Sequence, residues 1–466
     1  MSTSGGKVIQ VHSASAKKLF AALVPPLTEG AHKGQMGRVG VIGGSADFTG
    51  APYYAAEASL KFGGDLAFVF AAKQAVTPIK GYSPELMVTA FYDADTLIRP
   101  PRATTTAAEA GASAEQHAMV DAASKMSETV TRFLPRLHAV VAGPGLGREP
   151  QVLLAVLQVI QAARRSKLPL VLDADALWML SLDGNLHAVH GCAECVLTPN
   201  ANEFKQLIQA ALRAVGRREL GIADSSEAKK QALEEGLSSP FADVQLRALA
   251  SLLRCTVMLK GPVDLICSGA SVLESAAGKA VEELATVLED AEEEGEKGEG
   301  GKGGTAAAEA REKGLITDFP LLDVYQVQQA GSPRRCGGQG DVLAGTLGVA
   351  MHWAHSRRDL LRGLCLDINF QGGSSGADSQ EEEAKQQNAA VNTVADSDAL
   401  HAKATPPPAV LACLLASMVT RQASQYAFQD KRRSMTTPDL LTTIGTAFEV
   451  IVGEEFSVPG RDDEFY

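Results

Sequence analysis

The sequence predicts an α/β fold with a mostly parallel central sheet and helices on both faces. Short apolar runs that end in Gly- or Asp-bearing loops alternate with segments of helical length, which is typical of parallel sheets. The length of 466 residues and the hydrophobic fraction of 45% allow a large core. Because aromatic residues make up only 5% of the chain, that core must consist mostly of Ala, Val and Leu.

Five apolar runs are predicted strands. In chain order they are RVGVIGGS at 38–45, HAVVAGPGLG at 138–147, LPLVLDADAL at 168–177, CVLTPN at 195–200 and CTVMLKGPVD at 255–264. Apolar residues at helical spacing predict helices between them, such as APYYAAEASLKFG at 51–63 and PQVLLAVLQVIQAARR at 150–165. Four of these strands, all except CVLTPN, end in Gly- or Asp-bearing loops. Since ligands bind beyond the carboxyl ends of parallel strands, these four loops are expected to converge on one site.

Three segments interrupt the alternation of strands and helices. Residues 101–128, 285–314 and 371–408 are rich in small, charged or Gly and Pro residues and cannot bury enough apolar surface to order themselves. They are predicted disordered insertions in one domain over 29–451. Residues 1–28 and 452–466 are predicted flexible tails.

Composition excludes several classes of protein. The net charge of −12 argues against nucleic-acid binding, and no apolar run approaches the length of a membrane span. Seven cysteines in so long a chain indicate free thiols in a reducing compartment, and the cytoplasm is the expected location. The first 28 residues hold Lys7, Lys17 and Lys18 and no acid, a weak match to a mitochondrial transit peptide, so mitochondria are the alternative.

The stretch RRCGGQGDVLAG at 334–345 is a candidate anion-binding loop. Glycines let several backbone N–H groups turn inward, and the helix that follows adds its positive end. Asp341 in this loop would accept the proton of a hydroxyl that attacks a γ-phosphate. The chain has no GxxxxGK[ST] motif, so the loop is not a P-loop. The local pattern alone also allows Asp341 to be a helix N-cap.

Two further groups have more than one interpretation. Asp173 and Asp175 could position a substrate or a hydrated Mg²⁺, or could simply begin a helix. His187, His190, Cys192 and Cys195 are metal-ligand types within nine residues. Since the two pairs are separated by a single residue, an ordinary loop without a metal is expected.

Several ordered motifs resemble one family. They are HKGQMGRVGVIGGSADFTGAPYYAAEASLKFGGDL at 32–66, YSPELMV at 82–88, AGPGLGR at 142–148, LVLDADALWML at 170–180, LTPNANEF at 197–204, LKGPVD at 259–264, CGGQGDVLAGTLG at 336–348 and TRQASQYAFQDKRRSMTTPDLL at 420–441. Together they resemble the eukaryotic ATP-dependent (S)-NAD(P)H-hydrate dehydratases of the ribokinase-like superfamily. The insertions are longer than is usual in that family.

The resemblance implies an enzyme of nicotinamide nucleotide repair. Its substrate would be hydrated NADH or NADPH, its cofactors ATP and Mg²⁺, and its functional partner an NAD(P)H-hydrate epimerase; whether it forms a homo-oligomer stays open. ATP would phosphorylate the ring hydroxyl, and loss of phosphate would restore the dihydronicotinamide.

The family's functional residues carry over to matching positions. Asp341 would be catalytic and would contact the substrate. The other substrate residues implied are Gly143, Gly145, Gly147, Asn200, Ala201, Asn202, Glu203, Phe204, Lys205 and Gln206. The ATP residues implied are Lys260, Gly261, Pro262, Val263, Asp264, Gly331, Ser332, Pro333, Arg334, Arg335, Cys336, Gly337, Gly338, Gln339 and Gly340. No protein side chain is assigned to a metal.

Two other functions remain as alternatives. One is a ribokinase-like kinase that phosphorylates a vitamin precursor or alcohol and releases the product. The other is a nucleotide-binding protein without catalysis, against which the intact Gly-Asp pair at 340–341 argues. GPGLG and LTPNANEF favour the dehydratase over the kinase.

Overall fold

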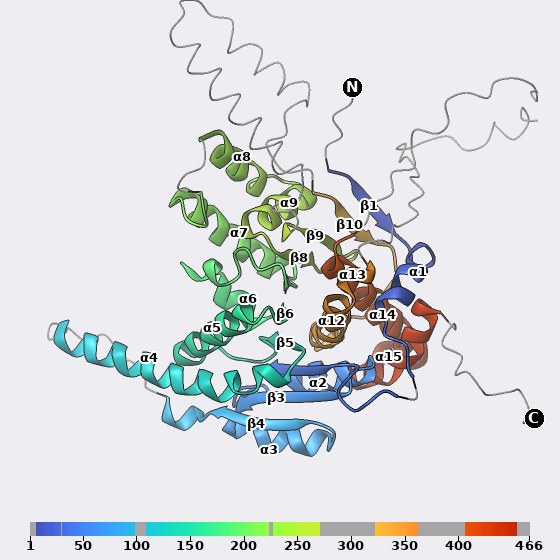
Figure 1. Ribbon diagram of the computed structural model, residues 1–466, viewed down its shortest axis with the longest axis horizontal. Coiled ribbons are helices and arrows are strands. Elements are labelled where there is room, and N and C mark those ends of the chain that lie inside the picture. The colour runs from blue at the N-terminus through green and yellow to red at the C-terminus, as the bar shows by residue number, and fades with distance from the viewer. Residues whose placement is uncertain are drawn as a thin grey trace, which may run out of the picture.

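A computed structural model describes residues 6–28, 30–97, 109–222, 227–270, 322–361 and 406–453. In this part of the chain, ten strands form one sheet in the order β1-β10-β9-β8-β7-β6-β5-β2-β3-β4 (Figure 1). The strands are β1 (Val8–Val11), β2 (Arg38–Ile42), β3 (Leu66–Ala72), β4 (Met87–Tyr92), β5 (Ala139–Ala142), β6 (Leu170–Leu172), β7 (Cys195–Leu197), β8 (Thr256–Leu259), β9 (Leu265–Ser268) and β10 (Val324–Val327).

The sheet is mostly parallel. β9 runs antiparallel to both of its neighbours, β8 and β10, and every other neighbouring pair is parallel. The five predicted strands correspond to β2, β5, β6, β7 and β8, so the predicted fold class is confirmed. From β2 the chain adds strands toward β4, and from β5 it adds strands in the opposite direction, so the strand order reverses between β2 and β5.

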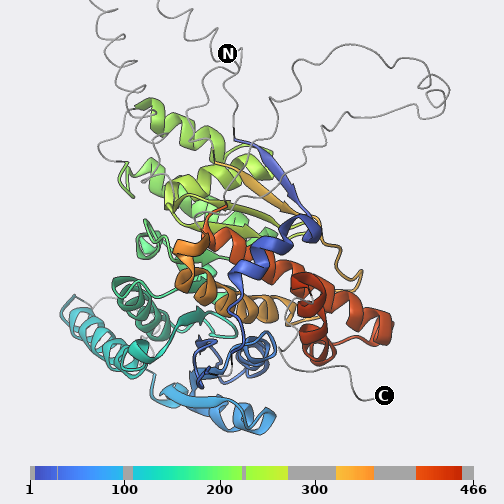
Figure 2. The ribbon, with the colours of Figure 1, turned by 45° about the vertical axis from the view of Figure 1, so that its right-hand side comes forward.

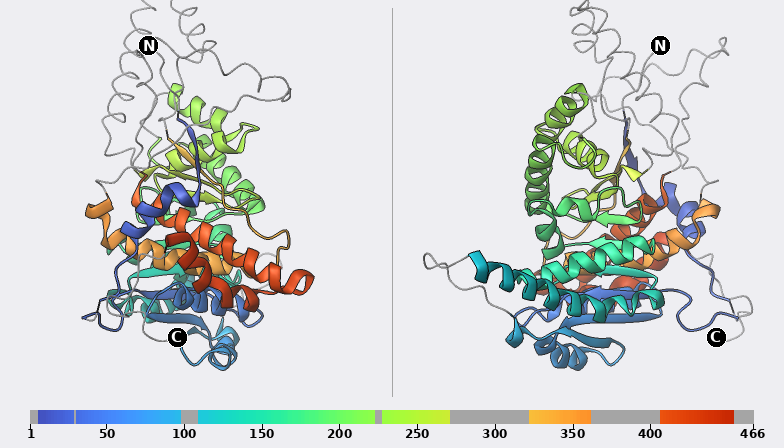
Figure 3. Two further views of the ribbon diagram at one scale, coloured as in Figure 1. Left: turned by 90° about the vertical axis from the view of Figure 1, so that its right-hand side faces the viewer. Right: turned by 60° about the vertical axis from the view of Figure 1, so that its left-hand side comes forward.

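Helices cover both faces of the sheet (Figures 1 and 3). One face carries α4 (Glu109–Thr131), α5 (Pro150–Arg165), α6 (Asp175–Leu180), α7 (Ala201–Gly216), α8 (Glu227–Leu237) and α9 (Ala242–Leu253). The other carries α1 (Ser13–Leu23), α2 (Gly50–Lys61), α12 (Gln339–Ser356), α14 (Pro408–Lys431) and α15 (Thr437–Val452). α3 (Lys73–Tyr82) packs on β3 and β4, α13 (Arg358–Leu361) follows α12, and the 3₁₀ turns are η1 (Ala94–Thr96), η2 (Leu134–Arg136), η3 (Asn185–Ala188) and η5 (Arg432–Ser434).

Helix α12 lies at the centre of the second layer. It contacts β2, β5 and β6 on one side and α2, α14 and α15 on the others, so nearly every residue after Asp341 is buried. Small residues permit this packing: a Cβ at Gly345 would lie 1.9 Å from the carbonyl oxygen of Ala55 on α2. The close fit fixes the N-terminus of α12 relative to the sheet edge.

The prediction of a flexible tail over 1–28 is wrong for most of that range. β1 pairs with β10 at the sheet edge, and α1 packs against α14 and α15 (Figure 2). The physical reason is an apolar face at helical spacing, in which Leu19, Phe20 and Leu23 are at most 2% exposed.

The predicted insertion at 101–128 is also wrong from residue 109 onward. Helix α4 begins at Glu109 and packs on α5, where Ala123 is fully buried and the Ser127 hydroxyl donates to Gln158. Alanine favours helix and fits a close helix pair, which a count of large apolar residues overlooks. The predicted insertions at 285–314 and 371–408 lie outside the described residues except for Pro406–Pro408, where α14 begins; of the predicted C-terminal tail, only Val452 and Gly453 are described.

Candidate functional site

The predicted loops meet at the carboxyl edge of the sheet, where the strand order reverses. The Gly44 N–H lies 3.1 Å from the carbonyl oxygens of both Pro144 and Gly145, so the loops after β2 and β5 are joined directly. The loop after β6 packs against them, because a Cβ at Gly143 would lie 1.8 Å from the Asp173 carbonyl oxygen. A reversal of strand order is the usual place for a ligand crevice in such sheets.

Asp175 fixes the conformation of the glycine loop after β5, at residues 143–147. Gly143, Gly145 and Gly147 all have positive φ, at 120°, 60° and 80°. Asp175 accepts from the Gly147 N–H at 3.0 Å and from Arg148 Nε at 3.3 Å, and the Arg148 guanidinium lies over the Trp178 ring at 4.6 Å. Asp175 does begin α6, but its carboxylate fixes the glycine loop as well.

Sequence reasoning missed two residues that line this loop. Phe48 is 57% exposed, and its Cβ lies 3.0 Å from the position that a Cβ on Gly145 would take. The hydroxyl oxygen of Ser45, beside Gly147, is buried and makes no hydrogen bond to any described residue. The available sequence signal for Phe48 was an aromatic residue in the Gly-rich loop between a predicted strand and a predicted helix.

Lys260, Asp173 and Glu203 form a charged cluster next to the glycine loop. Lys260 Nζ is 2.5 Å from Asp173 Oδ1, which also accepts from the Thr198 hydroxyl at 2.9 Å. Burial alone would lower the pKa of Lys260, but Asp173, Glu203 and Asp341 together raise it, so the ammonium group stays charged. Asp173 therefore pairs with a cation rather than capping a helix.

Asp341 faces this cluster from the first turn of α12. The N-cap of α12 is Gly338, in the left-handed conformation with φ 94°, and Asp341 is the third helical residue, so the N-cap interpretation is wrong. Burial, and then the negative charge of Asp173, raises the pKa of Asp341 to about 8, while Lys260 opposes the shift. Asp175 and Glu203 raise it further. A carboxyl group with a pKa near neutrality is suited to proton transfer.

The residues at 200–206 form the first turns of α7. The Asn200 side chain accepts from the N–H groups of Asn202 and Glu203, and Glu203 accepts from the Asn200 N–H, which completes a capping box. Burial is the main cause of the raised pKa of Glu203. Phe204 is buried in the core, while Ala201, Asn202, Lys205 and Gln206 are exposed.

The two loops predicted to bind ATP lie side by side. A Cβ at Gly340 would lie 3.4 Å from Lys260 Nζ, which places the end of the loop at 331–340 against the loop at 260–264. The loop at 331–340 is tied to the C-terminal helices. Arg334 Nε donates to the Met435 carbonyl, and the Thr437 hydroxyl donates to the Gly337 carbonyl. Gly337, Pro333 and Arg335 are exposed, and Val263 is 37% exposed.

Asp264 differs from the other predicted ATP residues. Its carboxylate is buried and accepts hydrogen bonds from Gly261 N–H, the Ser417 hydroxyl and Arg421. Its hydrogen bonds join its own loop to helix α14. Arg421 was quoted in a sequence motif, but its contact with this loop was not predicted.

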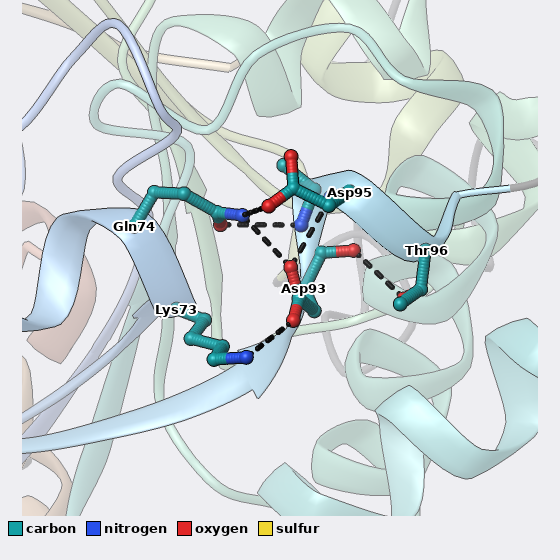
Figure 4. Close-up of polar contacts among 6 residues, drawn as sticks. Lys73, Gln74, Asp93, Asp95 and Thr96 are labelled. Carbon is teal, nitrogen blue, oxygen red and sulfur yellow. Dashed lines mark hydrogen bonds and ion pairs between the residues drawn. The ribbon is translucent and has the colours of Figure 1, made fainter.

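A second group of acids at the same sheet edge has a structural role (Figure 4). After β4, Asp93 accepts from Lys73 Nζ at 2.7 Å and from Gln74 Nε2 at 2.8 Å, and the same amide reaches Asp95 at 3.1 Å. The hydrogen bond from Lys73 is the main cause of the lowered pKa of Asp93. Since the charges of Asp93 are already paired, the group fixes the loop after edge strand β4.

The His and Cys residues of 187–195 surround the turn before β7. Cys192 and Cys195 are buried free thiols, and the His187 side chain lies 3.9 Å from Glu219. Across the described ranges, no three side chains of the types His, Cys, Asp and Glu are arranged to hold a metal ion.

Among the helices of the described ranges, none has the length and apolarity needed to cross a bilayer.

The chain is similar to known proteins over most of its length. The family model described as NAD(P)H-hydrate dehydratase matches residues 39–285. The human ATP-dependent (S)-NAD(P)H-hydrate dehydratase is 31% identical over 92% of this chain and 83% of its own, and that of Emericella nidulans is 32% identical over 95% of each. A crystal structure of a ribokinase-like superfamily protein from Enterococcus faecalis aligns with a TM-score of 0.50 at 13% identity, covering 96% of this chain and 97% of its own, and shows the same fold.

Proposed function

The chain belongs to the NAD(P)H-hydrate dehydratase family, and we propose that its reaction takes place between Asp341, the charged cluster and the glycine loop after β5. The enzyme restores NADH and NADPH from their S hydrates in an ATP-dependent dehydration. Hydroxide is a poor leaving group. Transfer of the γ-phosphoryl group to the ring hydroxyl converts it into phosphate, which the lone pair of the ring nitrogen can expel. Loss of a ring proton then restores the dihydronicotinamide, with ADP and phosphate as the other products.

Asp341 is the proposed general base. The observation that carries this assignment is its position in the first turn of α12, beside Lys260 and three other carboxylates that raise its affinity for a proton. It would take the hydroxyl proton as the oxygen attacks phosphorus. The N-terminus of α12 would stabilise the negative charge that develops on the transferred group.

The ATP phosphates are proposed to lie between the loops at 260–264 and 331–340. The charged side chain of Lys260 lies between the two loops. Gly338 is the N-cap of α12, so the backbone N–H groups that follow it form the positive end of a helix. Lys260 would balance the phosphate charge, and the glycines would let the backbone approach closely.

The residues present fit Mg²⁺ as a companion of ATP. No set of three ligands is preformed in the described ranges, but Asp173 and Glu203 offer carboxylate oxygens next to Lys260. Mg²⁺ commonly binds to one or two carboxylates together with substrate phosphates and waters. When bound, it would neutralise phosphate charge, and Asp173 and Glu203 are the side chains that would hold it.

The hydrated ring is proposed to lie against the glycine loop after β5. The exposed ring of Phe48 provides an apolar face there, and the unpaired hydroxyl of Ser45 offers a donor and an acceptor. The exposed side chains at the start of α7 would contact the rest of the dinucleotide: Asn200, Ala201, Asn202, Lys205 and Gln206.

We also propose a functional partnership with an NAD(P)H-hydrate epimerase, because an enzyme specific for the S hydrate leaves the R hydrate unrepaired.

The proposed compartment is the cytoplasm. The six described cysteines are all free thiols, which supports this location. Whether the active form is a homo-oligomer can be tested by light scattering.

The function is tested by incubating the purified protein with Mg-ATP and the S hydrate of NADH. We expect recovery of the dihydronicotinamide absorbance with one ADP and one phosphate formed per NADH. A phosphorylated hydrate that accumulates without NADH would indicate a kinase instead. Absence of any ATP-dependent change would contradict an enzymatic role.

A further inference from the structure

Helix α14 carries a polar stripe in the midst of apolar residues. Ser417, Arg421 and Ser424, which we call the α14 stripe, are spaced by four and three residues and so share one face. Ser417 and Ser424 are 1% and 6% exposed, and the Arg421 side chain is 14% exposed. Buried polar groups of this kind require hydrogen-bond partners. The partners lie in the two loops proposed to bind ATP.

Arg421 holds the loop at 260–264 through four hydrogen bonds. Its Nε and Nη2 donate to the two carboxylate oxygens of Asp264 at 2.9 and 2.6 Å. Its Nη1 donates to the Pro262 carbonyl and its Nη2 to the Gly261 carbonyl, each at 2.8 Å. Asp264 in turn accepts from the Gly261 N–H at 2.9 Å and from the Ser417 hydroxyl at 2.6 Å. The conformation of the loop directly after Lys260 is therefore set by two side chains of α14, mainly by Arg421 and also by Ser417.

The same stripe also holds the second loop. The Ser332 N–H donates to the Ser424 hydroxyl oxygen at 3.2 Å, and that hydroxyl donates to the Arg421 carbonyl at 2.8 Å. A Cβ at Gly331 would lie 3.6 Å from both Arg421 Cγ and Ser424 Oγ, so the loop at 331–340 starts in direct contact with the stripe. One helix face thus fixes the two loops relative to each other.

The chemistry of this contact requires a guanidinium group. Its planar fork can pair with a carboxylate and reach two carbonyl oxygens at once, whereas a lysine ammonium group is a single point of charge. Removing the charges from water is costly, so a buried ion pair is weak evidence for a contribution to stability. A role in setting the geometry of the loops accounts for a buried arginine at this place.

We propose that Arg421 is a positioning residue for ATP. It sets the distance between the two nucleotide loops from its place on α14 and does not touch the nucleotide. The inference rests on the proposed function of those loops. Without Arg421, the loop after Lys260 loses its fixed conformation, and ATP must order it on binding, which lowers affinity for ATP but not for the hydrated dinucleotide.

The test compares Arg421→Gln and Arg421→Lys with the wild-type full chain, using Mg-ATP and the S hydrate of NADH. For Arg421→Gln we expect KM for ATP to rise by about tenfold or more, while KM for the hydrate and kcat at saturating ATP stay within about threefold. Arg421→Lys should recover part of the loss, because it can pair with Asp264 but not with both carbonyls.

Arg247 provides a matched control. It is 16% exposed and donates to the Leu322 and Gly6 carbonyls and to Asp243, the same kinds of partner that Arg421 has. These contacts lie just before β10 and β1, at the edge of the sheet opposite the site. Arg247→Gln should lower the melting temperature and leave KM for ATP unchanged.

The proposal is overturned if KM for ATP in folded Arg421→Gln stays within about twofold of wild type, or if Arg247→Gln raises it equally. If Arg421→Gln does not fold, Ser424→Ala and Arg421→Lys decide, since unchanged ATP affinity in both would also overturn the proposal. Failure of the proposed function would look different, because the wild-type protein itself would then show no ATP-dependent turnover.

Discussion

At the scale of single residues, the chemistry of Asp341 comes from its neighbours. An isolated aspartate is a weak base, with an ordinary pKa of 3.8. Burial in the first turn of α12, beside Asp173, Asp175 and Glu203, raises that pKa to about 8. Lys260 opposes the shift, and the ionised form that can accept a proton becomes more abundant as the pH rises toward 8.

Replacing Asp341 by asparagine tests the assignment as a base. Asn keeps the shape of the side chain but cannot accept the proton, and general-base catalysis is worth about 10²–10⁴-fold. We expect NADH-hydrate turnover to fall by at least that order, while ATP affinity measured by calorimetry is kept, since backbone N–H groups hold the phosphates. Asp183→Asn, in an exposed carboxylate that Arg213 and Arg217 hold, is the control. Near-wild-type turnover in folded Asp341→Asn would rule out the base.

The raised pKa of Asp341 also predicts how stability depends on pH. The folded protein keeps a proton on this group up to about pH 8, whereas the unfolded chain releases it near pH 3.8. The resulting stabilisation is present at low pH and is lost as the pH rises toward 8. The wild type should therefore lose melting temperature between pH 5 and pH 8 in comparison with Asp341→Asn. The difference in melting temperature, variant minus wild type, should increase steadily over this range. A difference independent of pH would show that the carboxyl group is ionised throughout.

At the scale of elements, the loop between β2 and α2 carries a second testable role. Phe48 is exposed and contacts the glycine loop after β5, yet it supports no part of the core. Phe48→Ala should raise KM for the hydrate by about tenfold through the loss of a ring contact and leave KM for ATP and the melting temperature unchanged. Phe241→Ala, which removes an aromatic side chain 66% exposed before α9, is the control. Equal KM values for both variants would remove Phe48 from the substrate site.

The elements around the site were predictable because their signals are local. An apolar run followed by Gly or Asp reports a buried strand and its loop within ten residues, and β2, β5, β6 and β8 all follow this pattern. The network of Asp264 and Arg421 was not predictable, because it joins residues 157 positions apart. Its one local signal is an arginine inside a buried apolar helix, which requires a partner but does not identify it.

The pairing of Asp173 with Lys260 was hidden for the same reason. Both residues follow strands at the same sheet edge, which predicts proximity, but β7 lies between β6 and β8. Whether Asp173 caps its own helix or reaches across β7 depends on the backbone at Ala174, whose φ of 48° is unusual for a residue with a side chain. Such conformations are determined by tertiary packing and leave no compositional trace.

At the scale of the whole molecule, the N-terminal segment completes the fold rather than preceding it. Deleting residues 1–28 would remove β1 and α1, expose the edge of β10 and uncover apolar surface on α14 and α15. Burial of Leu19, Phe20 and Leu23 alone is worth about 5 kcal/mol, comparable to the net stability of many domains. We expect this truncation to aggregate, which light scattering of the purified protein measures. A folded, active protein lacking 1–28 would contradict this expectation.

The partnership of β1 with β10 also affects how the protein is made. Residues that pair at this edge are 316 positions apart, so β1 leaves the ribosome long before the strand that it must join. At common rates of translation this delay is roughly 15–60 s. Throughout that time the apolar faces of β1 and α1 have neither β10 nor α14 to cover them. The apolar faces of β1 and α1 therefore stay uncovered until β10 and α14 have been synthesised.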